Sequence, residues 1–137
     1  MHAMLRRDQK NMDADRECPD DVYQAHIAAF VSAFVERERR DRWIHLLSSR
    51  PKQLFKNSHK LHNHLDKSRC TELPEPISFD PTTVGMFCEF HADCLPLLVT
   101  GQRAIELGTG HDAIFSVVPG KLAVYFFHED FVMECHA

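Results

Sequence analysis

Residues 113–127 read AIFSVV-PG-KLAVYFF and carry the clearest fold signal in the chain. Two runs rich in β-branched and aromatic residues flank Pro119 and Gly120. Proline presets the φ angle of the first central position of a β-turn, and glycine accepts the positive φ of the next position. The stretch therefore predicts a β-hairpin.

A tight turn at Pro119-Gly120 also fixes which residues lie opposite one another. Three cross-strand pairs then share one wholly apolar face: Val117 with Leu122, Phe115 with Val124 and Ala113 with Phe126. The other face is mixed and carries Ser116, Lys121, Ala123 and Tyr125. Because an isolated hairpin is only marginally stable in water, we expect another part of the chain to cover the apolar face.

The N-terminal half supplies helices for this purpose. Asp21, with Gln24 three residues later, has the pattern of a capping box at a helix start. Apolar residues then recur with helical spacing: Val22, Tyr23, His26, Ile27, Phe30, Val31, Phe34 and Val35. A second helix is predicted from about Pro51 to Leu65. We expect the apolar hairpin face to pack against the stripe around Phe30 and Phe34 and against the Leu54–Leu65 stripe.

The remaining segments complete a prediction of the α+β class. A strand is predicted at Val84–Phe90, a short helix at Gln102–Leu107 and a last strand at residues 131–133, whereas residues 66–75 are predicted to be a connection. Helices that precede strands along the chain are typical of α+β domains. We therefore predict N-terminal helices packed on a mostly antiparallel C-terminal sheet with a short inserted helix. Residues 1–18 are predicted to be a mobile tail, and residues 19–137 a single domain.

Composition restricts the cellular setting. The chain has 137 residues, 44% of them hydrophobic, which fits one globular domain. Its five cysteines are odd in number and irregularly spaced, which favours reduced thiols over a disulfide framework. No apolar run approaches the length of a membrane span and no secretory signal is visible. We therefore expect a cytoplasmic protein without membrane contact.

One resemblance emerges from the hairpin. Residues 116–125 read SVVPGKLAVY. This segment resembles one found near the C-terminus of small uncharacterised bacterial proteins, in which a strand with a serine, a Pro-Gly-Lys-Leu-Ala turn and a strand with aromatic residues follow one another. The resemblance implies no activity and no catalytic residue.

Three kinds of chemistry are weighed and not favoured. Residues 104–112, AIELGTGHD, are similar to the first motif of S-adenosylmethionine-dependent methyltransferases, but that loop should leave a strand and enter a helix. The group His59, His62 and His64 and the run Cys88-x-x-His91-x-x-Cys94 do not match standard zinc spacings. No nucleophile signature is present. We therefore predict no cofactor, no metal and no catalytic residues.

The strongest functional feature is the charge distribution. Residues 39–69 hold nine Lys/Arg against two Asp/Glu, whereas residues 70–137 hold two Lys/Arg against ten Asp/Glu. The candidate residues for binding a partner or a phosphate are Arg39, Arg40, Arg42, Arg50, Lys52, Lys56 and Lys60. The alternative is a solvated helix face whose charge is balanced by the acidic half of the chain.

These observations lead to a ranked set of functions. We predict a small binding protein that contacts another protein. The alternative is nucleic-acid binding through residues 39–69, against which the overall pI of about 6.2 counts. An enzyme or a metal-binding protein ranks third.

Overall fold

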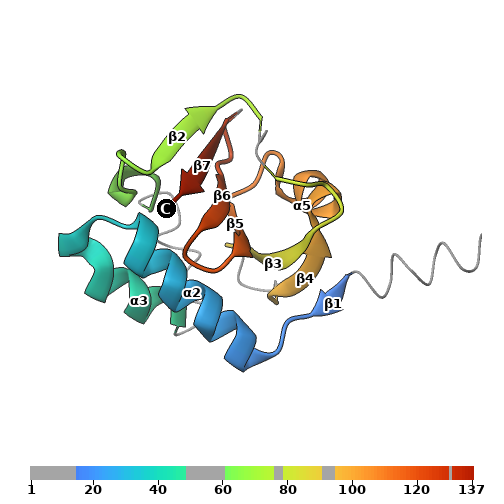
Figure 1. Ribbon diagram of the computed structural model, residues 1–137, viewed down its shortest axis with the longest axis horizontal. Coiled ribbons are helices and arrows are strands. Elements are labelled where there is room, and N and C mark those ends of the chain that lie inside the picture. Colours follow the sequence, from blue (N-terminus) through green and yellow to red (C-terminus); the bar gives the residue numbers. More distant parts are fainter. Residues whose placement is uncertain (1–14, 49–60, 76–78, 91–94, 130) are drawn as a thin grey trace, which may run out of the picture.

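The computed structural model describes residues 15–48, 61–75, 79–90, 95–129 and 131–137. Within them, N-terminal helices precede an antiparallel sheet that has a short helix inserted between two of its strands (Figure 1). The predicted α+β class is therefore confirmed. Two helices lie over one face of the sheet and the inserted helix lies over the other, so the fold has three layers.

The described strands form one seven-stranded sheet in the order β1-β4-β3-β5-β6-β7-β2. Every neighbouring pair is antiparallel. The strands are β1 (Arg16–Glu17), β2 (Cys70–Leu73), β3 (Val84–Glu89), β4 (Leu97–Thr100), β5 (Ala113–Val118), β6 (Leu122–Phe126) and β7 (Val132–His136). The predicted hairpin, β5–β6, therefore occupies the middle of the sheet.

The hairpin turn has the expected chemistry. The backbone N–H of Lys121 donates to the carbonyl of Val118 at 2.9 Å, and Gly120 has a φ of +71°. The predicted pairs of Ala113 with Phe126 and Phe115 with Val124 are confirmed. The third pair is wrong, because a register shift between Ser116 and Val118 places Val118, not Val117, opposite Leu122.

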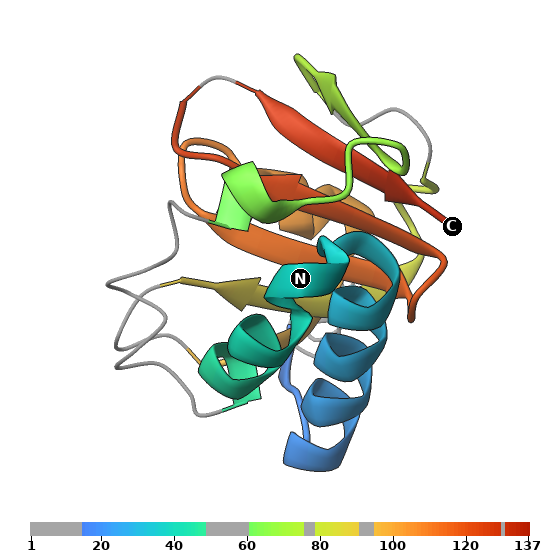
Figure 2. The same ribbon diagram turned by 90° about the vertical axis from the view of Figure 1, so that its left-hand side faces the viewer.

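One face of the sheet is covered by α2 (Asp20–Phe34), the short helix η1 (Arg37–Arg39) and α3 (Arg40–Ser48), which stand in front of the strands in Figure 2. Most of the predicted stripe on α2 is buried: Tyr23, Ile27, Phe30, Val31 and Phe34, followed by Val35. The helix starts at Asp20 after Pro19, so Asp21 lies in its first turn and is not the N-cap. Of the predicted second helix, residues 61–64 are helical and residues 51–60 lie outside the described part.

No helix among the described residues is long and apolar enough to cross a membrane.

The prediction of which hairpin face meets these helices is wrong. Phe115, Val124 and Phe126 pack on the opposite side of the sheet, with α5 (Gly101–Gly108) and Phe79. The face that contacts α2 and α3 carries Ile114, Ser116, Ala123 and Tyr125. Both faces are buried, and the mixed face tolerates burial because its polar groups find hydrogen-bond partners.

Several boundaries also differ from the predictions. Leu97–Thr100 and Cys70–Leu73 are strands, although no strand is predicted at the first and a connection is predicted at the second. The last strand is longer than predicted and ends at His136. At the N-terminal side, Arg16–Glu17 pairs with β4 and Cys18 is buried. The folded part therefore includes residues that the sequence assigned to a tail.

Phe115 provides a test of the inner packing. It is fully buried and its ring lies 5.5 Å from that of Phe79, centroid to centroid. We expect Phe115→Ala to lower the free energy of unfolding by about 3–5 kcal/mol, because it empties a large core site. Chemical denaturation measures this, and the exposed Val118→Ala serves as the control. A loss below about 1 kcal/mol would contradict the packing of this face.

The N-terminal boundary can be tested by two truncations. Removal of residues 1–14 should leave the melting temperature nearly unchanged. Removal of residues 1–18 also deletes β1, the buried Cys18 and the 2.7 Å ion pair between Asp15 and Arg103. The longer truncation should lower the free energy of unfolding by about 1–3 kcal/mol, because apolar area and backbone hydrogen bonds are lost. Equal stability of the two truncations would show that residues 15–18 contribute nothing.

Candidate functional site

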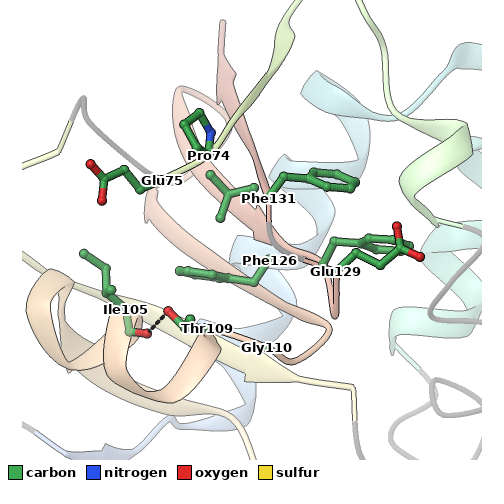
Figure 3. A pocket seen from close by; sticks show the side chains of 10 residues that line it. Pro74, Glu75, Ile105, Thr109, Gly110, Phe126, Glu129 and Phe131 are labelled. Carbon is green, nitrogen blue, oxygen red and sulfur yellow. Dashed lines mark hydrogen bonds between the residues drawn. The ribbon is translucent and has the colours of Figure 1, made fainter.

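A cavity of about 270 Å³ opens at one end of the sheet (Figure 3). Four segments that are far apart in the sequence surround it: the turn after β2, the end of α5, the end of β6 and the start of β7. Its described lining consists of Pro74, Glu75, Ile105, Thr109, Gly110, Phe126, Phe127, Glu129, Phe131 and Val132. The cavity therefore exists only when the sheet and α5 are assembled.

Local sequence explains how α5 forms one wall. A Cβ atom on Gly108 would lie 2.7 Å from the ring of Phe126, so glycine allows the helix to lie directly on that ring. The Thr109 hydroxyl donates to the carbonyl of Ile105 at 2.6 Å, and the Thr109 N–H donates to the same oxygen at 3.1 Å. These bonds end the helix, and Gly110, with a φ of +82°, turns the chain away. The C-terminal end of α5 therefore faces the cavity.

The cavity combines an apolar floor with negative charge. Phe126 and Val132 are buried, whereas Glu75 and Glu129 are exposed at its rim. The described lining contains no lysine, arginine or histidine. The C-terminal end of a helix also carries a partial negative charge. A cation is therefore favoured at this opening over an anion.

Aromatic rings support the wall formed by β6 and β7. The ring of His62 stacks on Phe127 at a centroid distance of 4.7 Å and lies 5.1 Å from Phe131. The two phenylalanine rings are themselves 5.1 Å apart. His62, which the sequence considered as a metal ligand, thus holds the aromatic wall in place.

A histidine–carboxylate pair fixes the turn between β6 and β7. The Asp112 Oδ1 atom accepts hydrogen bonds from the backbone N–H and from Nδ1 of His128, both at 3.0 Å. The His128 ring also lies 4.3 Å from that of Phe127. This pair joins the segment before β5 to the turn that carries Glu129, so it positions one rim of the cavity.

Tyr125 lies behind this region and stays protonated. Burial raises the pKa of its hydroxyl, and the nearby Asp112 carboxylate raises that pKa further. The tyrosine therefore acts as a buried neutral group and not as an acid near neutral pH.

The structure brings one serine and one histidine together elsewhere. Nδ1 of His26 on α2 lies 2.7 Å from Oγ of Ser116 on β5. A nucleophile must be reachable by its substrate, but Ser116 is only 1% exposed and lies between α2 and the sheet. His26 therefore provides a hydrogen-bond partner for the buried hydroxyl of Ser116, and a substrate cannot reach that hydroxyl for nucleophilic catalysis.

Three of the seven basic candidates can be placed. Arg39 and Arg42 are exposed, whereas Arg40 is half-buried and its Nε donates to the carbonyl of Val35 at 3.0 Å. Arg40 also lies close enough to Asp66 to affect the pKa of that carboxyl, which is lowered mainly by hydrogen bonds from Ser68. The other candidates, Arg50, Lys52, Lys56 and Lys60, lie outside the described residues. Among the residues that are described, no ion pair joins Arg39, Arg40 or Arg42 to the acidic half of the chain.

The other motifs of the sequence are separated in space. Trp43 Nε1 donates to Nδ1 of His64 at 2.9 Å, so His64 and His62 serve different partners. No group of three or more potential ligands in the described part of the chain could hold a metal ion; His59, His91 and Cys94 lie outside that part. Residues 104–112 run from a helix into a strand, the reverse of the order that a nucleotide-binding loop requires.

No sequence pattern predicts the cavity: Glu129 belongs to no motif, and Phe126 is predicted only as part of the apolar hairpin face. The lining residues come from segments up to 58 positions apart, from Pro74 to Val132. No local spacing signal connects such segments.

Comparisons with known proteins give no relative from which a role could be transferred. No protein family model matches the chain, and neither a curated protein nor a solved structure is significantly similar to it. The site therefore has to be interpreted from its own geometry.

His26 gives a test of the helix–sheet contact. Burial lowers the pKa of its imidazole below the ordinary 6.5, so folding favours the neutral form. The stability that depends on this form is fully present above the unfolded pKa and is lost as the pH falls below it. We expect His26→Gln to reduce the loss of melting temperature between about pH 7.5 and about pH 5.5. Thermal melts across this range measure it, with the exposed His45→Gln as the control. Identical pH dependence of the wild type and the His26 variant would contradict this.

Proposed function

We propose that this protein is a small binding domain that contacts another protein and takes one of its basic side chains into the cavity. The observation that carries the proposal is the lining, which combines phenylalanines and two glutamates with no cationic residue among those described. The proposal keeps the protein-interaction function predicted from the sequence. It places the contact at the cavity instead of the basic segment.

The chemistry of the lining suits lysine or arginine. Both side chains place an aliphatic stem against apolar surface and keep the charged head in a polar setting. The stem would lie on Phe126 and Ile105, while the head would meet Glu75 or Glu129. The end of α5 adds further negative potential.

The size of the cavity favours a side chain over a large cofactor. Pockets for drug-sized ligands and cofactors usually enclose about 300–1,000 Å³. The volume here, about 270 Å³, lies just below that range. A single side chain presented by a partner surface therefore fits this opening better than a dinucleotide.

The nucleic-acid alternative has less support. Phosphate binding requires several free cations on one surface. Only Arg39 and Arg42 of the described candidates are exposed, and Glu36, Glu38 and Asp41 are exposed beside them. A separate titration of the full chain with duplex DNA tests this alternative directly.

The proposal is tested by titrating the full chain with a short peptide that carries one arginine between leucines. We expect weak binding, with a dissociation constant on the order of 0.1–1 mM, because a single side chain is recognised. Backbone NMR signals of Thr109, Gly110 and Phe127 should shift. A peptide with glutamine in place of arginine should leave them unchanged.

Matched variants distinguish binding at the cavity from a general attraction between the acidic protein and a basic peptide. Glu75→Gln and Glu129→Gln should each weaken peptide binding, and the double variant should abolish it. Glu38→Gln makes the same change in charge on η1, away from the cavity lining, and should have no effect. Equal shifts with the glutamine peptide would exclude a basic side chain as the ligand, and loss of binding in the Glu38 variant would exclude the cavity as its site. Tighter binding of duplex DNA, with shifts at Arg39 and Arg42, would favour the nucleic-acid alternative.

A further inference from the structure

Two cysteines lie directly opposite each other at one edge of the sheet. Cys70 on β2 pairs with Cys135 on β7, and β2 is the last strand in the order (Figure 1). Both side chains are buried and belong to the core on the α2 side of the sheet. The neighbouring Cys70 side chain, followed by burial, raises the pKa of the Cys135 thiol.

The type of cross-strand pair decides whether these sulfurs can approach. The N–H of His136 donates to the carbonyl of Arg69 at 2.9 Å, so residues 69 and 136 form a hydrogen-bonded pair. Hydrogen-bonded and non-hydrogen-bonded pairs alternate along antiparallel strands, so Cys70 and Cys135 form the non-hydrogen-bonded type. In that type the Cα atoms are about 4.5 Å apart, within the range of about 4.4–6.8 Å that disulfides span.

The other described thiols lie away from this pair. Cys88 is on β3, and β5 and β6 separate that strand from β7. Cys88 therefore lies three strand spacings from Cys135 across the sheet, too far for a disulfide. Cys18 precedes α2 at the opposite edge, where its N–H donates to the carbonyl of Pro96. The topology therefore selects one pair of thiols.

The present contacts of the two sulfurs are weak. Sγ of Cys70 donates to the carbonyl of Phe34 at 3.8 Å, and Sγ of Cys135 to that of Met133 at 3.6 Å. Thiols are poor hydrogen-bond donors, so little is lost when their protons leave. A covalent bond between the sulfurs would replace these contacts without removing a strong one.

We propose that Cys70 and Cys135 form a reversible dithiol–disulfide site that is oxidised by hydroperoxides. When the short edge strand β2 opens and exposes Cys70, the Cys70 thiolate attacks one peroxide oxygen. The O–O bond breaks, the leaving hydroxide takes up the thiol proton and departs as water, and Cys70 becomes a sulfenic acid. Sγ of Cys135 then displaces that oxygen as a second water, and the S–S bond forms. Two protons and two electrons pass from the thiols to one hydrogen peroxide, which yields two waters. Added thiol reduces the bond again.

The disulfide would act on the strand that leads to the cavity. β2 has four residues, pairs only with β7 among the described strands and continues into Pro74 and Glu75, which line the cavity. A bond at Cys70 fastens the start of this strand to β7 and restricts the unfolded chain between residues 70 and 135. Oxidation is therefore expected to stabilise the fold and to slow the opening of β2.

The test uses the full chain, reduced, freed of reductant and treated with hydrogen peroxide at neutral pH. Intact mass should show the loss of two hydrogens per chain. A peptide map without reduction should show Cys70 linked to Cys135, and added thiol should restore both free cysteines. Since both thiols are buried, the reaction should be slower than that of glutathione in the same buffer. The oxidised protein should have a higher melting temperature.

Single substitutions provide the controls. Cys70→Ser and Cys135→Ser should each prevent the two-hydrogen loss, whereas Cys88→Ser, which removes a buried thiol of the same core, should retain it. The peptide map of the wild type does not depend on how well these variants fold. Both thiols remaining free after excess peroxide has acted for many times the period that oxidises glutathione fully, or a disulfide that joins other cysteines, would overturn the proposal. A Cys70–Cys135 bond that lowers the melting temperature would overturn the stabilising role assigned to it.

Discussion

Residues 113–117 of β5 are buried on both faces of the sheet, and this constraint organises the rest of the molecule. Residues 113–117 are all buried, because β5 lies in the middle of the sheet with β3 on one side and β6 on the other. A strand buried on both faces needs a cover on each side. α2 and α3 supply one cover, and α5 with Phe79 supplies the other.

The packing of α2 and α3 on the sheet requires that the polar side chains buried between them form hydrogen bonds. Ser116 is bonded to His26, the Tyr23 hydroxyl donates to the carbonyl of Leu47 at 2.6 Å, and Trp43 donates to His64. A buried polar group without a partner is costly, so each of these bonds also fixes how the helices sit on the sheet. No buried side-chain nitrogen or oxygen among the described residues lacks a partner. The cavity lies on the opposite face of the sheet, where Gly108 allows α5 to pack directly on the ring of Phe126.

The two proposed sites share the short edge strand β2. Its first residue, Cys70, faces Cys135, and the chain that follows its last residue lines the cavity with Pro74 and Glu75. An edge strand has one row of backbone groups without a strand partner and opens more easily than a central strand. Oxidation at Cys70 is therefore expected to restrict the motion of the wall of the cavity that Pro74 and Glu75 form.

The sequence by itself determined the elements whose signals are local: the Pro119-Gly120 hairpin with two of its three pairs, the α2 stripe, the strand at Val84–Glu89, the helix at residues 102–107 and the α+β class. These depend on turn chemistry and on side-chain period, which residues close in the chain define. Only the tertiary structure decided which hairpin face meets α2. Period two separates the faces, but Ser116 and Tyr125 became acceptable core residues only once distant partners satisfied them. The cavity and the Cys70–Cys135 pair were likewise decided by topology, because their residues are far apart in the chain and strand order alone brings them together.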